Sequence, residues 1–88
     1  MHILQKYKVR QVSGENIVLI QGSHPGDMTR VIALNDTSLY LWNNLYDRDF
    51  SIEDIVSLLM EKYDVNDTTA RADASGWVKT LKEHNIVV

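Results

Sequence analysis

Alternating apolar and polar residues in the first third of the chain predict strands. From Tyr7 to Val12 the alternation is typical of a strand with one buried and one wet face. The run from Asn16 to Gln21 is apolar without alternation, which indicates a central strand covered on both faces. Arg30 to Leu34 forms a third run, rich in β-branched residues. Because turn residues at Ser13–Asn16 and Gly22–Asp27 join these runs closely, we expect an antiparallel meander.

The remaining residues have the spacing of three helices. Asn35 or Asp36 can cap the first helix, which should end near Asp47. Ser51 to Asp54 has the pattern of a capping box and opens the second helix, and the third should run from about Thr68 to Glu83. The apolar stripes expected to face the core are Leu39, Trp42, Leu45 and Tyr46; Ile52, Ile55, Val56, Leu59 and Tyr63; and Ala70, Ala74, Trp77, Val78 and Leu81.

Two residues near the end of the third helix carry further expectations. Gly76 costs about 1 kcal/mol relative to Ala inside a helix, so we expect close packing around it. Asn85 can adopt the left-handed conformation that ends a helix, after which Ile86 to Val88 would pack back on the core. The predicted fold class is α+β, a three-stranded antiparallel sheet followed by three helices in the order β-β-β-α-α-α.

Composition fits one folded domain over residues 1–88. A chain of 88 residues with 44% hydrophobic residues can build one small core. It contains no cysteine, which rules out disulfides, a thiolate nucleophile and Cys-ligated metal, and favours a reducing compartment; we expect the cytoplasm. Its longest apolar runs have four residues, far below the roughly 20 that span a bilayer, so no membrane segment is expected.

Charge is divided unevenly along the chain. Residues 1–34 carry a net charge of +2 and residues 35–88 a net charge of −5, which together give the total of −3. A protein that neutralises several phosphates needs a clustered cationic face. The basic residues Lys6, Lys8 and Arg10 lie on the wet face of an alternating strand, without the aromatic ladder of a single-strand binder. Nucleic-acid binding is therefore disfavoured.

No motif for catalysis, metal binding or cofactor binding is present. The histidines His2, His24 and His84 lack the short spacing of metal ligands. No nucleophile elbow surrounds a serine, and no phosphate-binding glycine loop occurs. Helix capping explains the acidic cluster near the second helix better than a general acid/base pair does; the cluster comprises Asp47, Asp49, Glu53 and Asp54. We expect no catalytic residue, no metal and no cofactor.

The third strand, Arg30 to Leu34, is the most informative element. In a three-stranded meander it forms an edge, and an apolar edge is a hazard unless it is covered or used. A helix could cover it. Alternatively, an extended peptide could add to it as a further strand and gain affinity from main-chain hydrogen bonds. The pattern alone leaves both interpretations of this edge open.

The two tryptophans lie on apolar helical stripes. Trp42 and Trp77 are therefore expected in the core rather than in a platform that binds a ligand.

Five segments from the third strand onward form a pattern by their order and spacing. They are Val31-Ile32-Ala33-Leu34-Asn35-Asp36-Thr37-Ser38, then Trp42, Ser51-Ile52-Glu53-Asp54-Ile55, Tyr63-Asp64-Val65, and Ala70-Arg71-Ala72-Asp73 with Trp77, Val78 and Leu81. Through these segments the chain resembles the PqqD family, whose fold is shared by the recognition elements that bind precursors of ribosomally made, modified peptides. The resemblance covers about residues 30–88. The chain differs from the family in the loop Asp47-Arg48-Asp49, which lacks the usual Gly, in Ser75, where a larger apolar residue is usual, and in Asn85, which replaces a common Gly.

This resemblance implies a winged helix-turn-helix-like, non-catalytic module. Such a module binds the leader segment of a precursor peptide and presents it to a modifying enzyme, often a radical SAM maturase. The leader would add beside the third strand and pack against the third helix. The residues implied for peptide binding are Arg30, Val31, Ile32, Ala33 and Leu34 on the strand, and Arg71, Ala74, Ser75 and Val78 on the helix. Arg30 and Arg71 would suit an acidic leader.

Two other functions remain open at the level of sequence. A winged-helix regulator that binds nucleic acid shares the overall shape, but it needs a basic third helix and salt-dependent binding to DNA. A degenerate domain that acts only as a protein–protein scaffold is the other. The adaptor, by contrast, needs a precursor peptide and a modifying enzyme encoded near it.

Overall fold

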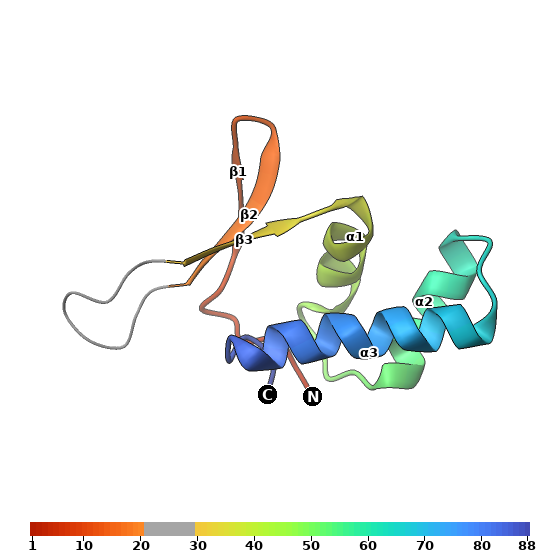
Figure 1. The fold of residues 1–88 in the computed structure, drawn as a ribbon. Helices are drawn as coiled ribbons and strands as arrows, with labels where there is room; N and C mark the ends of the chain where they lie inside the picture. Colours follow the sequence, from red (N-terminus) through yellow and green to blue (C-terminus); the bar gives the residue numbers. More distant parts are fainter. Residues whose placement is uncertain (21–29) are drawn as a thin grey trace.

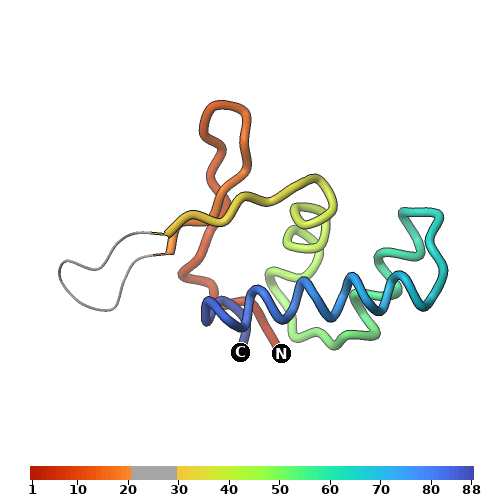
Figure 2. Tube along the Cα trace, in the orientation of Figure 1, coloured from red at the N-terminus to blue at the C-terminus, as the bar shows by residue number. Residues whose placement is uncertain are grey.

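The structure is a computed structural model that describes residues 1–20 and 30–88. The sheet and the helices follow one another along the chain (Figure 1), and the trace runs without an interleaved element (Figure 2). The predicted order β-β-β-α-α-α is confirmed. The elements are β1 (Val9–Val12), β2 (Glu15–Ile20), β3 (Arg30–Leu34), α1 (Asp36–Leu45), α2 (Ile52–Lys62) and α3 (Asp67–Glu83).

The sheet is an antiparallel meander in the order β1-β2-β3, as predicted. Val18 of β2 lies opposite both Val9 and Ile32, which fixes the register of the three strands. The expectation that β2 is covered on both faces is wrong. Val18 and Ile20 are buried, but Leu19 is 37% exposed because its face of the sheet, shared with Val31, is not covered by the described elements. The apolar character of Leu19 had hidden the alternation.

Each of the three helices begins directly after a residue whose side chain caps its N-terminus. Asn35 caps α1 by accepting a hydrogen bond from the Ser38 backbone N–H at 2.8 Å. Ser51 and Asp54 form both halves of the predicted capping box at the start of α2. Asn66 caps α3, so this helix begins at Asp67, one residue before the expected start.

The core lies between the buried face of the sheet and the helices. Most members of the three predicted stripes are buried, while Leu39, Tyr46, Ile52, Tyr63 and Trp77 are partly buried and pack against the core. Trp42 is 3% exposed and stacks on Tyr46, as expected of a core residue. The buried residues that form the core are Ile3, Val18, Ile20, Leu34, Leu41, Trp42, Leu45, Phe50, Ile55, Val56, Leu59, Ala70, Ala74, Val78, Leu81, Ile86 and Val87.

The two ends of the chain are joined by a short β-bridge. Ile3 pairs with Val87, and His2 and Val88 exchange two backbone hydrogen bonds of 2.8 and 3.0 Å. Asn85 has the expected positive φ of 58°, which ends α3 and turns the chain back toward the core. Ile86 and Val87 are buried as predicted, but Val88 is exposed. The pairing of the ends was not visible in the sequence because it joins residues more than 80 positions apart.

Gly76 is not closely packed, contrary to expectation. A Cβ atom built at this position would meet no heavy atom within 4 Å, so the backbone there faces open space. The predicted turn Gly22–Asp27 and His24 lie outside the described residues. None of the helices in residues 1–20 and 30–88 combines the length and apolar character that crossing a bilayer requires.

Candidate functional site

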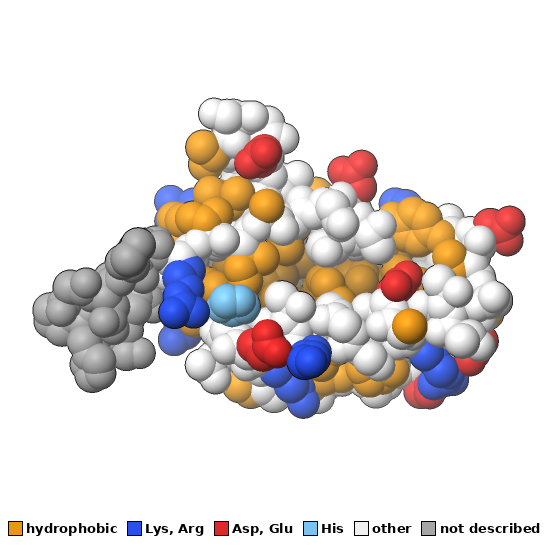
Figure 3. Space-filling model, in the orientation of Figure 1, with side chains coloured by type: hydrophobic (Ala, Val, Ile, Leu, Met, Phe, Trp, Pro, Cys, Tyr) orange, Lys and Arg blue, Asp and Glu red, His pale blue; other side chains and the backbone are white. Residues whose placement is uncertain are grey.

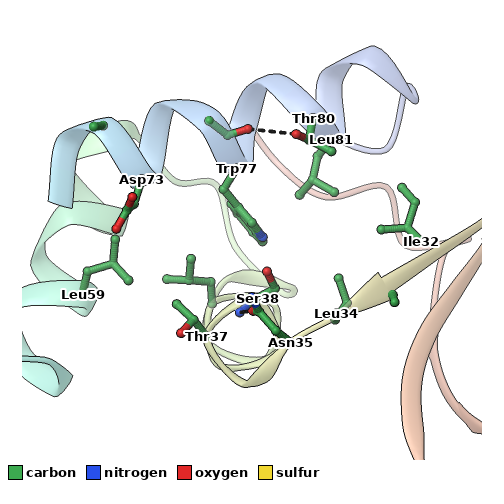
Figure 4. Close-up of a pocket in the computed structure, with 14 residues that line it drawn as sticks. Ile32, Leu34, Asn35, Thr37, Ser38, Leu59, Asp73, Trp77, Thr80 and Leu81 are labelled. Atoms are coloured by element: carbon green, nitrogen blue, oxygen red, sulfur yellow. Dashed lines mark hydrogen bonds between the residues drawn. The ribbon is translucent and has the colours of Figure 1, made fainter. Parts of the chain in front are cut away.

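A groove of about 510 Å³ separates β3 from α3. Its floor is apolar because the buried residues Leu34, Leu41 and Leu59 converge beneath it, and hydrophobic atoms are visible in this hollow in Figure 3. One wall is β3 together with the start of α1, and the other is α3 (Figure 4). The residues that α3 contributes, here called the groove flank, are Ala72, Asp73, Gly76, Trp77, Thr80 and Leu81.

β3 offers an unused backbone edge beside this groove. It pairs with β2 along one side, and in the described residues no strand pairs with its other side. α3 lies across this groove from the strand, so α3 does not cover the edge. An open edge next to an apolar groove can accept an extended chain, whose main chain pairs with the strand while its side chains enter the groove.

Polar groups line the mouth of the groove. Ser38 lies at the start of α1, and Asp73 and Thr80 lie on α3. Thr80 Oγ1 donates to the Gly76 carbonyl oxygen at 3.0 Å, and the Asn35 side-chain oxygen already accepts its capping bond. Asp73 is the one charged residue among the described residues that line the groove.

Trp77 reaches from α3 across the groove toward Ser38 and Asn35, with its indole nitrogen at the end away from the helix (Figure 4). The ring is partly buried and packs against Phe50, with ring centroids 6.4 Å apart. The side chain was expected in the core; instead it joins the core to the groove wall. Its Nε1–H is buried and has no hydrogen-bond partner, the one such side-chain group among the described residues.

The structure places three of the five strand residues implied for peptide binding in the wall of this groove. Ile32, Ala33 and Leu34 line the groove, while Arg30 and Val31 lie at the start of the same strand and are exposed. Val31 is 55% exposed on the face of the sheet away from the core. All five residues belong to β3, whose outer edge pairs with no strand in the described part of the chain.

The four helix residues implied by the resemblance do not line the groove. Ala74 and Val78 are buried in the core. Ser75 lines a separate shallow hollow beside Ile52 and Met1, on the side of α3 that faces α2. Arg71 and Ser75 define this side, here called the α2 flank. The wall opposite β3 is instead the groove flank.

Arg71 on the α2 flank is held by two carboxylates. Its Nη2 donates to Glu53 Oε2 at 2.9 Å and its Nη1 to Glu53 Oε1, while its Nε donates to Asp67 Oδ2 at 2.7 Å. The hydrogen bonds from Arg71 hold the pKa of the Glu53 carboxyl below its ordinary value. The hydrogen bonds to Glu53 and then to Asp67 raise the pKa of the guanidinium. Arg71 thus ties α3 to α2.

Sequence reasoning missed the groove flank because a helical pattern marks the core stripe and leaves both of its sides alike. Residues advance by about 100° around a helix, so Arg71 and Ser75 lie on one side of the Ala70–Ala74–Leu81 stripe. Asp73, Gly76 and Thr80 lie on the other side. Only the packing of α3 on α2 shows which side faces β3. Gly76 was the one local signal, since a residue without a side chain leaves space.

Three basic residues near the start of the chain lie apart from the groove. Lys6, Lys8 and Arg10 border a hollow of about 310 Å³ next to Leu19, away from the groove. Lys6 Nζ lies 5.2 Å from the centroid of the Tyr7 ring. In residues 1–20 and 30–88, no group of three or more His, Cys, Asp or Glu side chains is arranged to hold a metal ion.

Comparison with known proteins identifies the family. A family model described as coenzyme PQQ synthesis protein D (PqqD) matches residues 15–87, which is most of the chain. Comparisons with curated proteins and with solved structures gave no match. The matched range includes β2, β3 and all three helices, and hence both walls of the groove. The resemblance noted in the sequence is thereby confirmed, and the chain belongs to the coenzyme PQQ synthesis protein D (PqqD) family.

Proposed function

We propose that this chain is a non-catalytic adaptor that binds the leader segment of a ribosomally made precursor peptide. The leader adds to β3 as a fourth antiparallel or parallel strand, and its side chains enter the groove between β3 and α3. The adaptor then presents the peptide to a modifying enzyme, such as a radical SAM maturase. Membership of a family of synthesis accessory proteins supports this role.

The open edge of β3 beside an apolar groove is the observation that carries the proposal. Main-chain hydrogen bonds to the edge supply affinity without regard to sequence, and the groove supplies selectivity through the side chains that it admits. The binding residues proposed are Arg30, Val31, Ile32, Ala33 and Leu34 on the strand and Ala72, Asp73, Gly76, Trp77, Thr80 and Leu81 on the helix.

This assignment changes the charge expected of the leader. Arg71 and Arg30 had together suggested an acidic peptide, but the guanidinium of Arg71 is paired with Glu53 and Asp67. The groove itself contains the carboxylate of Asp73. Arg30 alone, at the start of β3, remains suited to a leader carboxylate.

No observation favours the nucleic-acid regulator. A recognition helix needs cations on its exposed side. On α3 the groove flank carries Asp73, and Arg71 on the α2 flank is neutralised by its two partners. Lys79 and Lys82 are the remaining cations of this helix, and Glu83 lies beside them.

An NMR titration tests the proposal directly. The ¹⁵N-labelled chain is titrated with a synthetic leader of the short precursor peptide encoded nearest to it. We expect saturable shifts in residues 31–38 and 72–81 and in the indole resonance of Trp77. The indole of Trp42 serves as an internal control because it lies in the core, stacked on Tyr46. In parallel, the chain is mixed with a DNA duplex and examined by gel shift, where it should show no salt-dependent binding.

Two results would contradict the proposal. One is the absence of shifts with the leader at millimolar concentration. The other is a set of shifts confined to the hollow bordered by Lys6, Lys8 and Arg10, which lies away from the groove.

A further inference from the structure

The indole N–H of Trp77 is buried and has no hydrogen-bond partner among the described residues. Nearly all buried donors in folded proteins have a partner, and one that lacks a partner destabilises the folded state. The nitrogen lies at the groove end of a side chain that crosses toward Ser38 and Asn35 (Figure 4). The ring lines the groove, which has a volume of about 510 Å³. A ligand atom that accepts a hydrogen bond from this N–H would remove that destabilisation.

The groups around Trp77 restrict what that ligand can be. Asp73 is an exposed carboxylate on the same wall, one helical turn from Trp77. It accepts hydrogen bonds but cannot donate one when ionised. Ser38, across the groove, has a hydroxyl that can donate or accept. The site therefore combines one donor with an acceptor of negative charge.

We propose that the groove selects a carboxamide side chain, Asn or Gln, in the bound peptide. The amide oxygen accepts the hydrogen bond from Trp77 Nε1, and the amide NH₂ donates to the hydroxyl of Ser38, which lies nearest the indole nitrogen (Figure 4). The inference rests on the proposed function, because it concerns the peptide that adds to β3. Trp77 is thereby a specificity-determining residue, which recognises a carboxamide side chain.

Other side chains satisfy the site less well. A carboxylate could accept from Trp77, but it would meet the like charge of Asp73. An ammonium or guanidinium could pair with Asp73 but offers no acceptor to the indole. An apolar side chain fills the groove and leaves the N–H unpartnered. A carboxamide alone presents an acceptor and two donors on one planar group.

A random heptapeptide display library tests this selection without knowledge of the natural leader. The wild-type chain and Trp77→Phe are used as baits, with thermal unfolding measured to confirm that both are folded. We expect wild type to enrich apolar peptides that carry Asn or Gln at one fixed position. Trp77→Phe should bind related peptides without that preference. Lys79→Gln, an exposed change outside the groove, is the matched control and should keep it.

A double-mutant cycle then isolates the hydrogen bond. The selected peptide and its Gln→Met counterpart, which keeps the length but loses the amide, are measured against wild type and Trp77→Phe. We expect the Gln→Met change to weaken binding to wild type by about three- to tenfold, the range for a neutral hydrogen bond. The same change should weaken binding to Trp77→Phe less than it weakens binding to wild type, because only the hydrogen bond from the amide NH₂ is left to lose there. In wild type, the selected peptide should also move the Trp77 indole proton downfield, a readout that needs no variant.

The outcomes separate this inference from the proposed function. If wild type enriches peptides that shift β3 resonances but show no preference for Asn or Gln, or a preference for Asp or Glu, the carboxamide inference is overturned and the adaptor role stands. If no peptide binds, both fail. If the cycle gives equal losses for wild type and Trp77→Phe, Trp77 is not the donor.

Discussion

Two glycines of the chain lie in opposite backbone situations. Gly76 lies inside α3 and faces open space, whereas Gly14 has φ of +82° in the turn between β1 and β2. Gly76→Ala should raise the free energy of unfolding by about 0.5–1 kcal/mol, because alanine favours the helix and meets no neighbour. Gly14→Ala should lower it by about 1 kcal/mol, since an L-residue is strained at that φ. Urea denaturation measures both, and a loss of stability in Gly76→Ala would contradict the open space seen there.

The pairing of Glu53 with Arg71 predicts a pH dependence. The pKa of Glu53 is lowered in the folded chain, so its contribution is present above the unfolded-state pKa and is lost as pH falls through the folded pKa. The stability difference between wild type and Arg71→Gln should therefore be measurable near pH 7 and shrink as the pH falls from about 4.5 toward 3.

Urea denaturation followed by circular dichroism at each pH checks this dependence, with Lys79→Gln as the control for loss of one α3 cation. A difference between Arg71→Gln and wild type that stays constant across that range would show that the pair contributes nothing. Because both side chains are substantially exposed, the effect should also weaken at high salt.

At the scale of elements, local chemistry was readable and relative orientation was not. The capping box at Ser51, the stop at Asn85 and the apolar stripes of the helices are set by neighbouring residues, so the sequence predicted them. β3 was predicted as an edge because it is the last strand of a three-stranded meander, and the order β1-β2-β3 confirms this. The side of α3 that faces β3 depends on the long-range packing of α3 on α2, to which Arg71 contributes an ion pair with Glu53. A one-dimensional pattern does not contain that information.

The difference between the two flanks of α3 yields a test by filling the groove. Thr80 and Lys79 are adjacent and both exposed, but only Thr80 lines the groove. Thr80→Trp should weaken leader binding by at least about tenfold, equivalent to about 1.4 kcal/mol, because the larger side chain occupies the space for the peptide. Lys79→Trp should change the affinity by less than about twofold. Isothermal titration calorimetry with the same leader measures both, and equal effects would place the peptide elsewhere.

At the scale of the whole molecule, the two ends of the chain pair with each other and contribute buried residues to the core. Ile86 is fully buried, whereas Val88, two residues further, is 53% exposed. Ile86→Ala should lower the free energy of unfolding by about 2–5 kcal/mol, a large share of the roughly 5–15 kcal/mol expected for a small domain. Val88→Ala should stay within about 0.5 kcal/mol. Denaturation midpoints of the two variants decide this, and a small loss for Ile86→Ala would mean that the last residues are dispensable.

The bridge between Ile3 and Val87 also determines how the molecule can be tethered. Both ends leave from one place, and Met1 borders the hollow on the α2 flank together with Ser75, on the side of α3 away from the groove. A linker, a surface anchor or a fused enzyme can therefore be attached at either end and approach from the same direction (Figure 1). Either attachment leaves the groove open. A circular permutant that joins His2 to Val88 through a few glycines, with new ends at Ser13 and Gly14, would keep both walls of the groove in one uninterrupted stretch of chain.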